Sequence, residues 1–263
     1  MSDCPRITAD VLSELLLAER VDLELQAAWS DLAECVPELG ALAMEGATHL
    51  HKDNVAHTIA VTAKTPARLR VRLLALFHDV GKPVTRVVTG STVTFHGHEA
   101  AGGPLTKRAL VRLGYDEAFA DEVASLVAMS GDAKGSELWT DAAIRRFDKS
   151  AGKYVDDLLD FMAVDVTSKH LYKHEAVARE VAVLRERIAA VRQADEAAAW
   201  RPVVSGDDIM RRYDLAPSRE VGRLLQAVIA AQKSAEATGA VYTIDEAFGL
   251  LDGILYTGSQ SLG

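Results

Sequence analysis

The amino-acid sequence predicts an all-α protein that carries one small β-hairpin. Hydrophobic residues recur every three or four positions along almost the whole chain, which is the spacing of one face of an α-helix. The one clear β signal comes from two segments rich in Thr and Val, residues 85–89 and 92–95, which flank Gly90 and Ser91 as a hairpin turn. The chain has 263 residues, 49% of them hydrophobic, so it can bury a core in one or two domains.

Composition and charge disfavour several classes of protein. Lys and Arg total 29 against 38 Asp and Glu, and the net charge of −9 repels polyanions at long range, although a local basic site is compatible with it. Cys4 and Cys35 form no CxxC pair, so neither a disulfide framework nor a zinc–thiolate site is expected. No signal segment is present, and no apolar run approaches the ~20 residues that span a bilayer. We therefore expect a cytoplasmic protein without membrane contact; the sequence does not determine its oligomeric state.

Residues 1–200 are predicted to form the main domain. It begins with helices over residues 7–50, continues with a core over residues 51–170 and ends in a long helix over residues 171–197. Hydrophobic residues spaced by three or four define one face of the long helix: Val177, Val181, Leu184, Ile188 and Val191.

Residues 201–263 are predicted to form a helical tail. The segment Trp200-Arg201-Pro202 breaks the helical pattern, and Ser205, Ala216-Pro217 and Thr243 then separate three further helices. Thr243 and Glu246 have the spacing of a capping box, in which side chain and backbone satisfy each other at a helix start.

Local signals define the helices of the core. Asp53 can cap one helix, and Pro66 suits the first turn of the next. This next helix has Leu69, Leu73, Leu76, Phe77 and Val80 at helical spacing. The segment Gly81-Lys82-Pro83 ends it, which places His78 and Asp79 in its last turn. Further helices are expected over residues 97–113, 116–129, 140–150 and 153–169.

Asp165 is an acidic residue within a hydrophobic pattern. Its predicted helix places Leu158, Phe161, Met162 and Val166 on the inward side, and Asp165 falls inside this stripe. An unpaired buried carboxylate costs several kcal/mol, so Asp165 needs a partner. The partner is either a metal ion or a buried arginine, for which Arg145 and Arg146 are the candidates.

Two histidines and two carboxylates are candidate metal ligands: His57, His78, Asp79 and Asp165. Imidazole and carboxylate groups suit a divalent cation that holds water and a phosphate oxygen for hydrolysis. Taken singly, each has a simpler explanation, since His57 can be a helix-surface residue and a His-Asp dipeptide occurs by chance.

Polar residues that follow this pair add possible substrate contacts. Lys82 is placed to neutralise a phosphate, or is a solvated lysine favoured by the end of a helix. His96, His98 and Glu99 come after the hairpin at the start of a helix, where an anion or a second metal can bind. The alternative is a surface cluster, in which His96 is the weakest candidate.

At these residues the chain resembles the HD superfamily of metal-dependent phosphohydrolases. More narrowly, it is similar to the HD region and helical tail of bacterial CCA-adding tRNA nucleotidyltransferases, over about residues 7–256. The matching segments are HKDNVAHT, LLALFHDVGKP, VTFHGHEAAG, WTDAAIRRF, LLDFMAVDVTS and, in the tail, GDDIMRRYDLAPSREVGRLLQAVIAAQ.

The resemblance implies an HD-domain helical bundle in which His57, His78, Asp79 and Asp165 bind one divalent cation, with Mn, Ni, Co, Fe and Mg as candidates. Relatives with two metals place a histidine where this chain has Ser130, a poor ligand, which favours a single ion. Catalytic roles are expected for Asp79, Lys82 and His98. Substrate binding is expected for four residues: Lys82, His96, His98 and Arg145.

The resemblance also implies a substrate class, namely nucleotide or RNA-end phosphates, cleaved by a 2′,3′-cyclic phosphodiesterase or phosphomonoesterase. The Gly-Ser loop and Asp-x-Asp pair of the polymerase head are not found in this sequence, so nucleotide addition is not expected. Whether a separate chain supplies such a head stays open.

Two other functions are compatible with the sequence. The same ligand set serves 5′-nucleotidases and deoxynucleoside triphosphate hydrolases. Alternatively, the chain is an inactive scaffold that contacts tRNA or another RNA, although basic helix faces are usually only solvated. Three clusters are candidates for such phosphate contacts: Arg68/Arg70/Arg72, Lys107/Arg108/Arg112 and Arg145/Arg146/Lys149.

Overall fold

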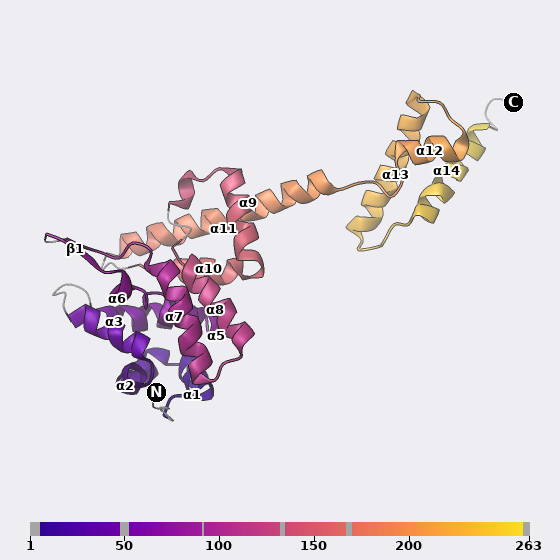
Figure 1. Cartoon of the computed structure of the whole chain (residues 1–263). Coiled ribbons are helices and arrows are strands. Elements are labelled where there is room, and N and C mark those ends of the chain that lie inside the picture. Colours follow the sequence, from indigo (N-terminus) through magenta and orange to yellow (C-terminus); the bar gives the residue numbers. More distant parts are fainter. Residues whose placement is uncertain (1–5, 48–52, 91, 132–134, 167–169, 260–263) are drawn as a thin grey trace. The chain divides into compact units, whose positions relative to one another are not determined.

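The computed structural model describes residues 6–47, 53–90, 92–131, 135–166 and 170–259. In this part the chain is almost entirely helical, with one two-stranded antiparallel hairpin, so the predicted all-α class is confirmed (Figure 1). Contacts divide the chain into two compact units, one up to Arg192 and the other from Gln193. Among the described helices, none combines the length and the hydropathy needed to cross a membrane.

Three helices begin the first unit: α1 (Ala9–Leu17), α2 (Val21–Cys35) and α3 (Pro37–Ala47). Their buried leucines, among them Leu12, Leu25 and Leu39, join the core of the unit. Cys35 is buried at the end of α2 and is disulfide-bonded, a bond that the sequence did not predict. The other cysteine, Cys4, lies outside the described residues.

Helix α5 (Leu69–Phe77) lies at the centre of the first unit, with every residue from Val71 to Phe77 buried. The helices packed against it include α1, α4 (Asn54–Lys64), α8 (Glu117–Met129) and α10 (Val155–Met162). As predicted, Asp53 caps α4, because its carboxylate accepts a hydrogen bond from the backbone N–H of Ala56 at 2.9 Å. Pro66, by contrast, lies before α5, in a turn closed by the N–H of Arg68 on the Pro66 carbonyl.

The chain after α5 differs from the prediction over a few residues. Helix α5 ends at Phe77, so His78 and Asp79 lie in the turn that follows it. Pro83 lies in the first turn of the short helix α6 (Lys82–Thr85). Proline is tolerated at that position, so Pro83 does not prevent a new helix from forming there. The hairpin is β1 (Val87–Thr89) and β2 (Thr92–Thr94), and Ser91 of its predicted turn lies outside the described residues.

Helix α7 (His98–Leu113) follows the hairpin and packs along α8. After them come a short 3-10 turn, Ser136–Leu138, then α9 (Asp141–Ala151) and α10, which the 3-10 turn Gly152–Tyr154 joins. The prediction of one helix over residues 153–169 is wrong at its end, because α10 stops at Met162 and Asp165 lies in the turn beyond it.

Helix α11 (Leu171–Ala199) is the predicted long helix, and Val181, Leu184, Ile188 and Val191 of its hydrophobic face are buried. The second unit contains α12 (Gly206–Tyr213), α13 (Arg219–Ala237) and α14 (Ile244–Ser259) around a small core of its own. At the start of α14, Thr243 and Glu246 form the predicted capping box, with hydrogen bonds of 2.7 and 3.2 Å.

Candidate metal centre

Three segments that are distant in the sequence bring the four candidate ligands to one place. His57 comes from α4, His78 and Asp79 from the turn after α5, and Asp165 from the turn after α10. The ligand atoms of His57, His78 and Asp79 all lie within 4.8 Å of one another. Asp79 Oδ2 is 3.2 Å from His78 Nε2 and 3.9 Å from His57 Nε2. Such a group is compact enough to share one cation.

Asp165 faces the two imidazoles. Its Oδ1 is 3.3 Å from His57 Nε2 and 3.7 Å from His78 Nε2. The sequence left open a buried ion pair between Asp165 and Arg145 or Arg146. In the structure Asp165 faces the two histidines instead, and both arginines are exposed on α9. Asp165 therefore adds a fourth donor group, a carboxylate, beside the three clustered groups.

The imidazole of His78 is oriented as a metal ligand would be. Its Nδ1 is 2.7 Å from the carbonyl oxygen of Ala75, so Nδ1–H donates to that carbonyl and the Nε2 lone pair is directed at the cluster. His78 Nε2 is buried and has no hydrogen-bond partner of acceptable geometry, although Asp79 Oδ2 lies 3.2 Å away. A buried polar atom without a partner is costly, and a divalent cation would satisfy this one. The residues present thus fit a divalent metal.

Electrostatic interactions within the cluster shift three pKa values. Burial of the imidazole opposes its protonation, but the carboxylates of Asp79 and Asp165 outweigh it and raise the pKa of His78 to about 9. Burial also acts to raise the pKa of Asp79, yet His78, His98 and Lys82 hold it well below its usual range. In Asp165 burial is likewise outweighed, mainly by His57 and His78, and the pKa is lowered. Without a cation, the two carboxylates therefore favour the protonated imidazole of His78, and a cation that binds Nε2 must displace this proton.

Metal affinity is therefore expected to rise with pH up to the pKa of His78, about 9. Affinity rises with pH because a cation binds the deprotonated imidazole of His78. The fraction of His78 in this form grows about tenfold per pH unit below the pKa. Calorimetric titration with Mn²⁺ should show an apparent association constant up to about tenfold larger at pH 8 than at pH 7. An affinity that is equal at these two pH values would contradict the assignment of His78 as a ligand.

Lys82 and His98 lie on either side of Asp79. Lys82 is one helical turn along the chain and its Nζ is 2.5 Å from Asp79 Oδ2. His98 Nε2 is 3.4 Å from Asp79 Oδ1, while its Nδ1 is 2.9 Å from the carbonyl oxygen of Phe95 and 3.2 Å from Glu99 Oε2. Asp79 is thus the common contact of a lysine and three histidines, which makes it the centre of the cluster.

A close approach of two backbones brings His98 to this position. A Cβ atom on Gly81 would lie 2.0 Å from the carbonyl oxygen of His98 and 2.8 Å from the backbone nitrogen of Gly102. Only glycine fits there, so α7 can begin directly against the turn that carries Asp79. The sequence assigned Gly81 only to the segment that ends a helix and did not indicate this close approach.

The remaining predicted site residues lie elsewhere. His96 is exposed in the turn before α7, and Arg145 is exposed on α9. Ser130 is buried at the end of α8, where its hydroxyl donates to the carbonyl of Val127 at 2.8 Å, so it serves the helix end.

Most of the basic residues proposed for RNA contact are used within the protein. Arg70 pairs with Glu122 and Asp157, and Arg68 pairs with Asp157 and Asp160. Arg72 is buried and donates to carbonyl oxygens in and after α1. In the second cluster, Lys107 pairs with Glu117 and Asp121, and Arg112 pairs with Glu38. These partners neutralise the charges and weaken the case for an RNA scaffold in this unit.

We expect one cation per chain after loading with excess Mn²⁺ and removal of unbound metal, because among the described residues a single group of three such ligands is found. Asp165→Asn is expected to lower the retained metal, since the amide lacks the charge of the carboxylate that faces both imidazoles. Elemental analysis by mass spectrometry measures this. The matched control is Asp156→Asn, which removes an exposed carboxylate paired with Arg185. Two equivalents in the parent protein would contradict the prediction.

Comparison with known proteins agrees with this geometry. Residues 51–191 match the HD domain family, a range that contains all four candidate ligands. The chain is 31% identical over 245 residues to the CC-adding tRNA nucleotidyltransferase of Thermus thermophilus, covering 89% of this chain and 50% of that protein. It is 32% identical over 222 residues to the A-adding tRNA nucleotidyltransferase of Deinococcus radiodurans, covering 81% of this chain and 49% of that protein. The chain therefore spans about half the length of these relatives.

Proposed function

Because the chain belongs to the HD domain family, we propose that it is a metal-dependent phosphohydrolase that acts on nucleotide or RNA-end phosphates, as a 2′,3′-cyclic phosphodiesterase or phosphomonoesterase. The observation that carries this proposal is the approach of His57, His78 and Asp79 to within 4.8 Å, with Asp165 against both imidazoles. The names of the two relatives refer to tRNA, which favours RNA ends within this substrate class.

A divalent cation, when bound, polarises a phosphoryl oxygen and lowers the pKa of a water molecule. His57, His78, Asp79 and Asp165 would hold it. Within the chain itself, Ala75 keeps the ring of His78 in the orientation that presents Nε2. Asp79 Oδ2 faces His57 and His78, and Asp79 Oδ1 faces His98. Asp79 therefore connects the metal ligands with His98, the proposed general acid.

His98 and Lys82 are the proposed partners of the phosphate. Both ring nitrogens of His98 face acceptor oxygens, so a proton on Nε2 can be held at Asp79 and passed to a leaving oxygen. Lys82 contacts Asp79 Oδ2, and from this position its ammonium can neutralise the charge of a substrate phosphate. No covalent intermediate on the protein is required.

Hydrolysis assays test the proposal directly. The protein is incubated with 2′-, 3′- and 5′-AMP and with adenosine 2′,3′-cyclic phosphate, each with Mn²⁺, Ni²⁺, Co²⁺ or Mg²⁺. Cation-dependent release of phosphate or opening of the cyclic phosphate is expected, and absence of turnover under all conditions would overturn the proposal. Deoxynucleoside triphosphates are included because release of tripolyphosphate would assign the site to the triphosphohydrolase class.

A further inference from the structure

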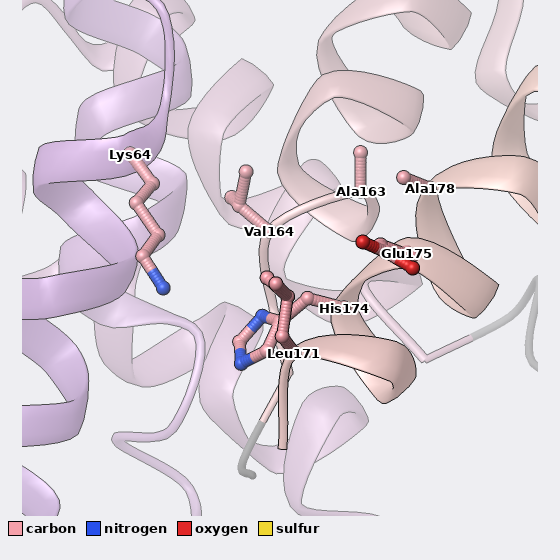
Figure 2. Close-up of a pocket in the computed structure, with 7 residues that line it drawn as sticks. All are labelled: Lys64, Ala163, Val164, Leu171, His174, Glu175 and Ala178. Carbon is pink, nitrogen blue, oxygen red and sulfur yellow. The ribbon is translucent and has the colours of Figure 1, made fainter. Parts of the chain in front are cut away.

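An open cavity of about 680 Å³ is lined by residues of α4, of the turn after α10 and of α11 (Figure 2). None of the four candidate ligands lines it, but two of its lining residues neighbour ligands along the chain. One wall contains Val164, the residue before Asp165; another contains Lys64, on the same helix as His57. A third wall is formed by the first turns of α11, including Leu171 and His174. The turn after α10 and helix α4 thus each contribute one residue to the cavity and one to the metal centre.

Lys64 is placed to contact the part of a substrate that lies beyond the reacting phosphate. It is seven residues after His57 on α4, which puts both side chains on the same face of the helix, about 10 Å apart along its axis. Figure 2 shows its ammonium directed into the cavity, toward Leu171 and His174. The side chain is exposed, and no ion pair of Lys64 is found within the described part of the chain. Its charge is thus available to an anion.

The lining has the character of a site for a nucleoside. Val164, Leu171 and Ala178 offer apolar surface on which a flat base can pack, while Glu175 and His174 supply polar groups for sugar hydroxyls. The volume is within the range of roughly 300–1,000 Å³ typical of small-molecule sites. Apolar surface together with the ammonium of Lys64 matches a nucleoside followed by a second phosphate.

We propose that this cavity binds the terminal nucleoside of an RNA 3′ end and that Lys64 binds the phosphodiester that precedes it. The inference rests on the proposed function, because the reacting phosphate is taken to lie at the metal centre. It adds a substrate preference: an RNA end of two or more nucleotides should bind better than a mononucleotide. Lys64 is then a residue that determines specificity and takes no part in the chemical step.

Two cyclic phosphates that differ only in the preceding nucleotide test this preference. They are adenosine 2′,3′-cyclic phosphate and the dinucleotide cytidylyl-adenosine 2′,3′-cyclic phosphate. The parent protein is expected to cleave the dinucleotide with a kcat/KM about tenfold higher, through KM. Lys64→Gln should remove this advantage and leave cleavage of the mononucleotide unchanged. Lys173→Gln, an exposed lysine in the first turn of α11 that does not line the cavity, is the matched control and should change neither value.

Binding measurements separate failure of this inference from failure of the proposed function. Calorimetry in the presence of Mn²⁺ uses the 3′-methylenephosphonate analogues of adenosine and cytidylyl-adenosine, whose phosphorus–carbon bond resists hydrolysis. Tighter binding of the dinucleotide that is lost in Lys64→Gln supports the cavity even if no substrate is cleaved. Equal binding of the two analogues, or an advantage retained in Lys64→Gln, overturns it even if both cyclic phosphates are hydrolysed. Ala178→Trp, which narrows the cavity, should weaken both analogues.

Discussion

Replacing His78 and Asp79 together with alanine is expected to abolish metal retention and to reduce the rate of phosphate release by more than about 100-fold. Mutation of a residue that only supports a metal ligand lowers activity by up to about 100-fold, so the loss of two ligands should lower it further. The two side chains are only 4% and 3% exposed, and they supply the nitrogen and oxygen that lie 3.2 Å apart at the centre of the cluster. Metal content by elemental analysis and steady-state rates with the preferred nucleotide measure the effect.

Val80→Ala is the control for this double variant. Val80 is buried directly beside Asp79, so its truncation leaves a small cavity and lowers stability, while it removes no donor atom. It should retain metal and most of the activity. If the His78→Ala/Asp79→Ala variant is folded and hydrolyses substrate as fast as the parent, the metal centre is not the active site.

Gly81→Ala is expected to destabilise the protein by about 1–3 kcal/mol and to impair catalysis as well. The added methyl group would lie 2.0 Å from the carbonyl oxygen of His98, and backbone atoms cannot give way as a flexible side chain can. The start of α7 must move, and His98 moves with it away from Asp79. Urea unfolding gives the loss of stability, and rates measured below the transition give the loss of activity.

Gly222→Ala provides a comparison for the Gly81 substitution. Gly222 lies inside α13, where a Cβ atom would meet nothing within 4 Å, so alanine should leave stability unchanged or raise it by about 0.5–1 kcal/mol. Both substitutions are chemically identical, and the difference between them isolates the close approach. Normal activity and stability in Gly81→Ala would show that α7 does not need this contact to position His98.

Sequence periodicity predicted the helices well but overestimated how far α5 and α10 extend. Asp165 shows why, because its place in the hydrophobic stripe of α10 continued a pattern that the backbone itself does not follow beyond Met162. The carboxylate still turns inward, since the N–H of Asp165 bonds to the carbonyl of Phe161 as in a helix. The hydrophobic pattern reflects which side chains face the core, whereas the end of a helix depends on its backbone hydrogen bonds. The sequence therefore indicated the inward direction of Asp165 but not the residue at which α10 ends.

The arginines at the start of α5 illustrate the opposite case. As a sequence cluster, Arg68 and Arg70 are compatible with phosphate contacts, because nothing local shows which charges will approach them. Folding places Glu122 and Asp157 within 2.9 and 3.3 Å of the Arg70 guanidinium, and these partners come from α8 and α10. The sequence showed how many arginines lie in this segment. Whether they can contact a phosphate depends on carboxylates from distant segments, which pair with them in the folded protein.

The sequence by itself determined the all-α class, the cap at Asp53, the capping box at Thr243 and the residue types of a metal centre. These depend on periodicity, on neighbours within one helical turn and on the chemistry of single side chains. Only the tertiary structure decided that His98 lies against Asp79, that α5 is surrounded on its buried faces, and that a cavity opens between Lys64 and His174. Such features arise where segments far apart in the chain approach one another, and no local pattern records that approach.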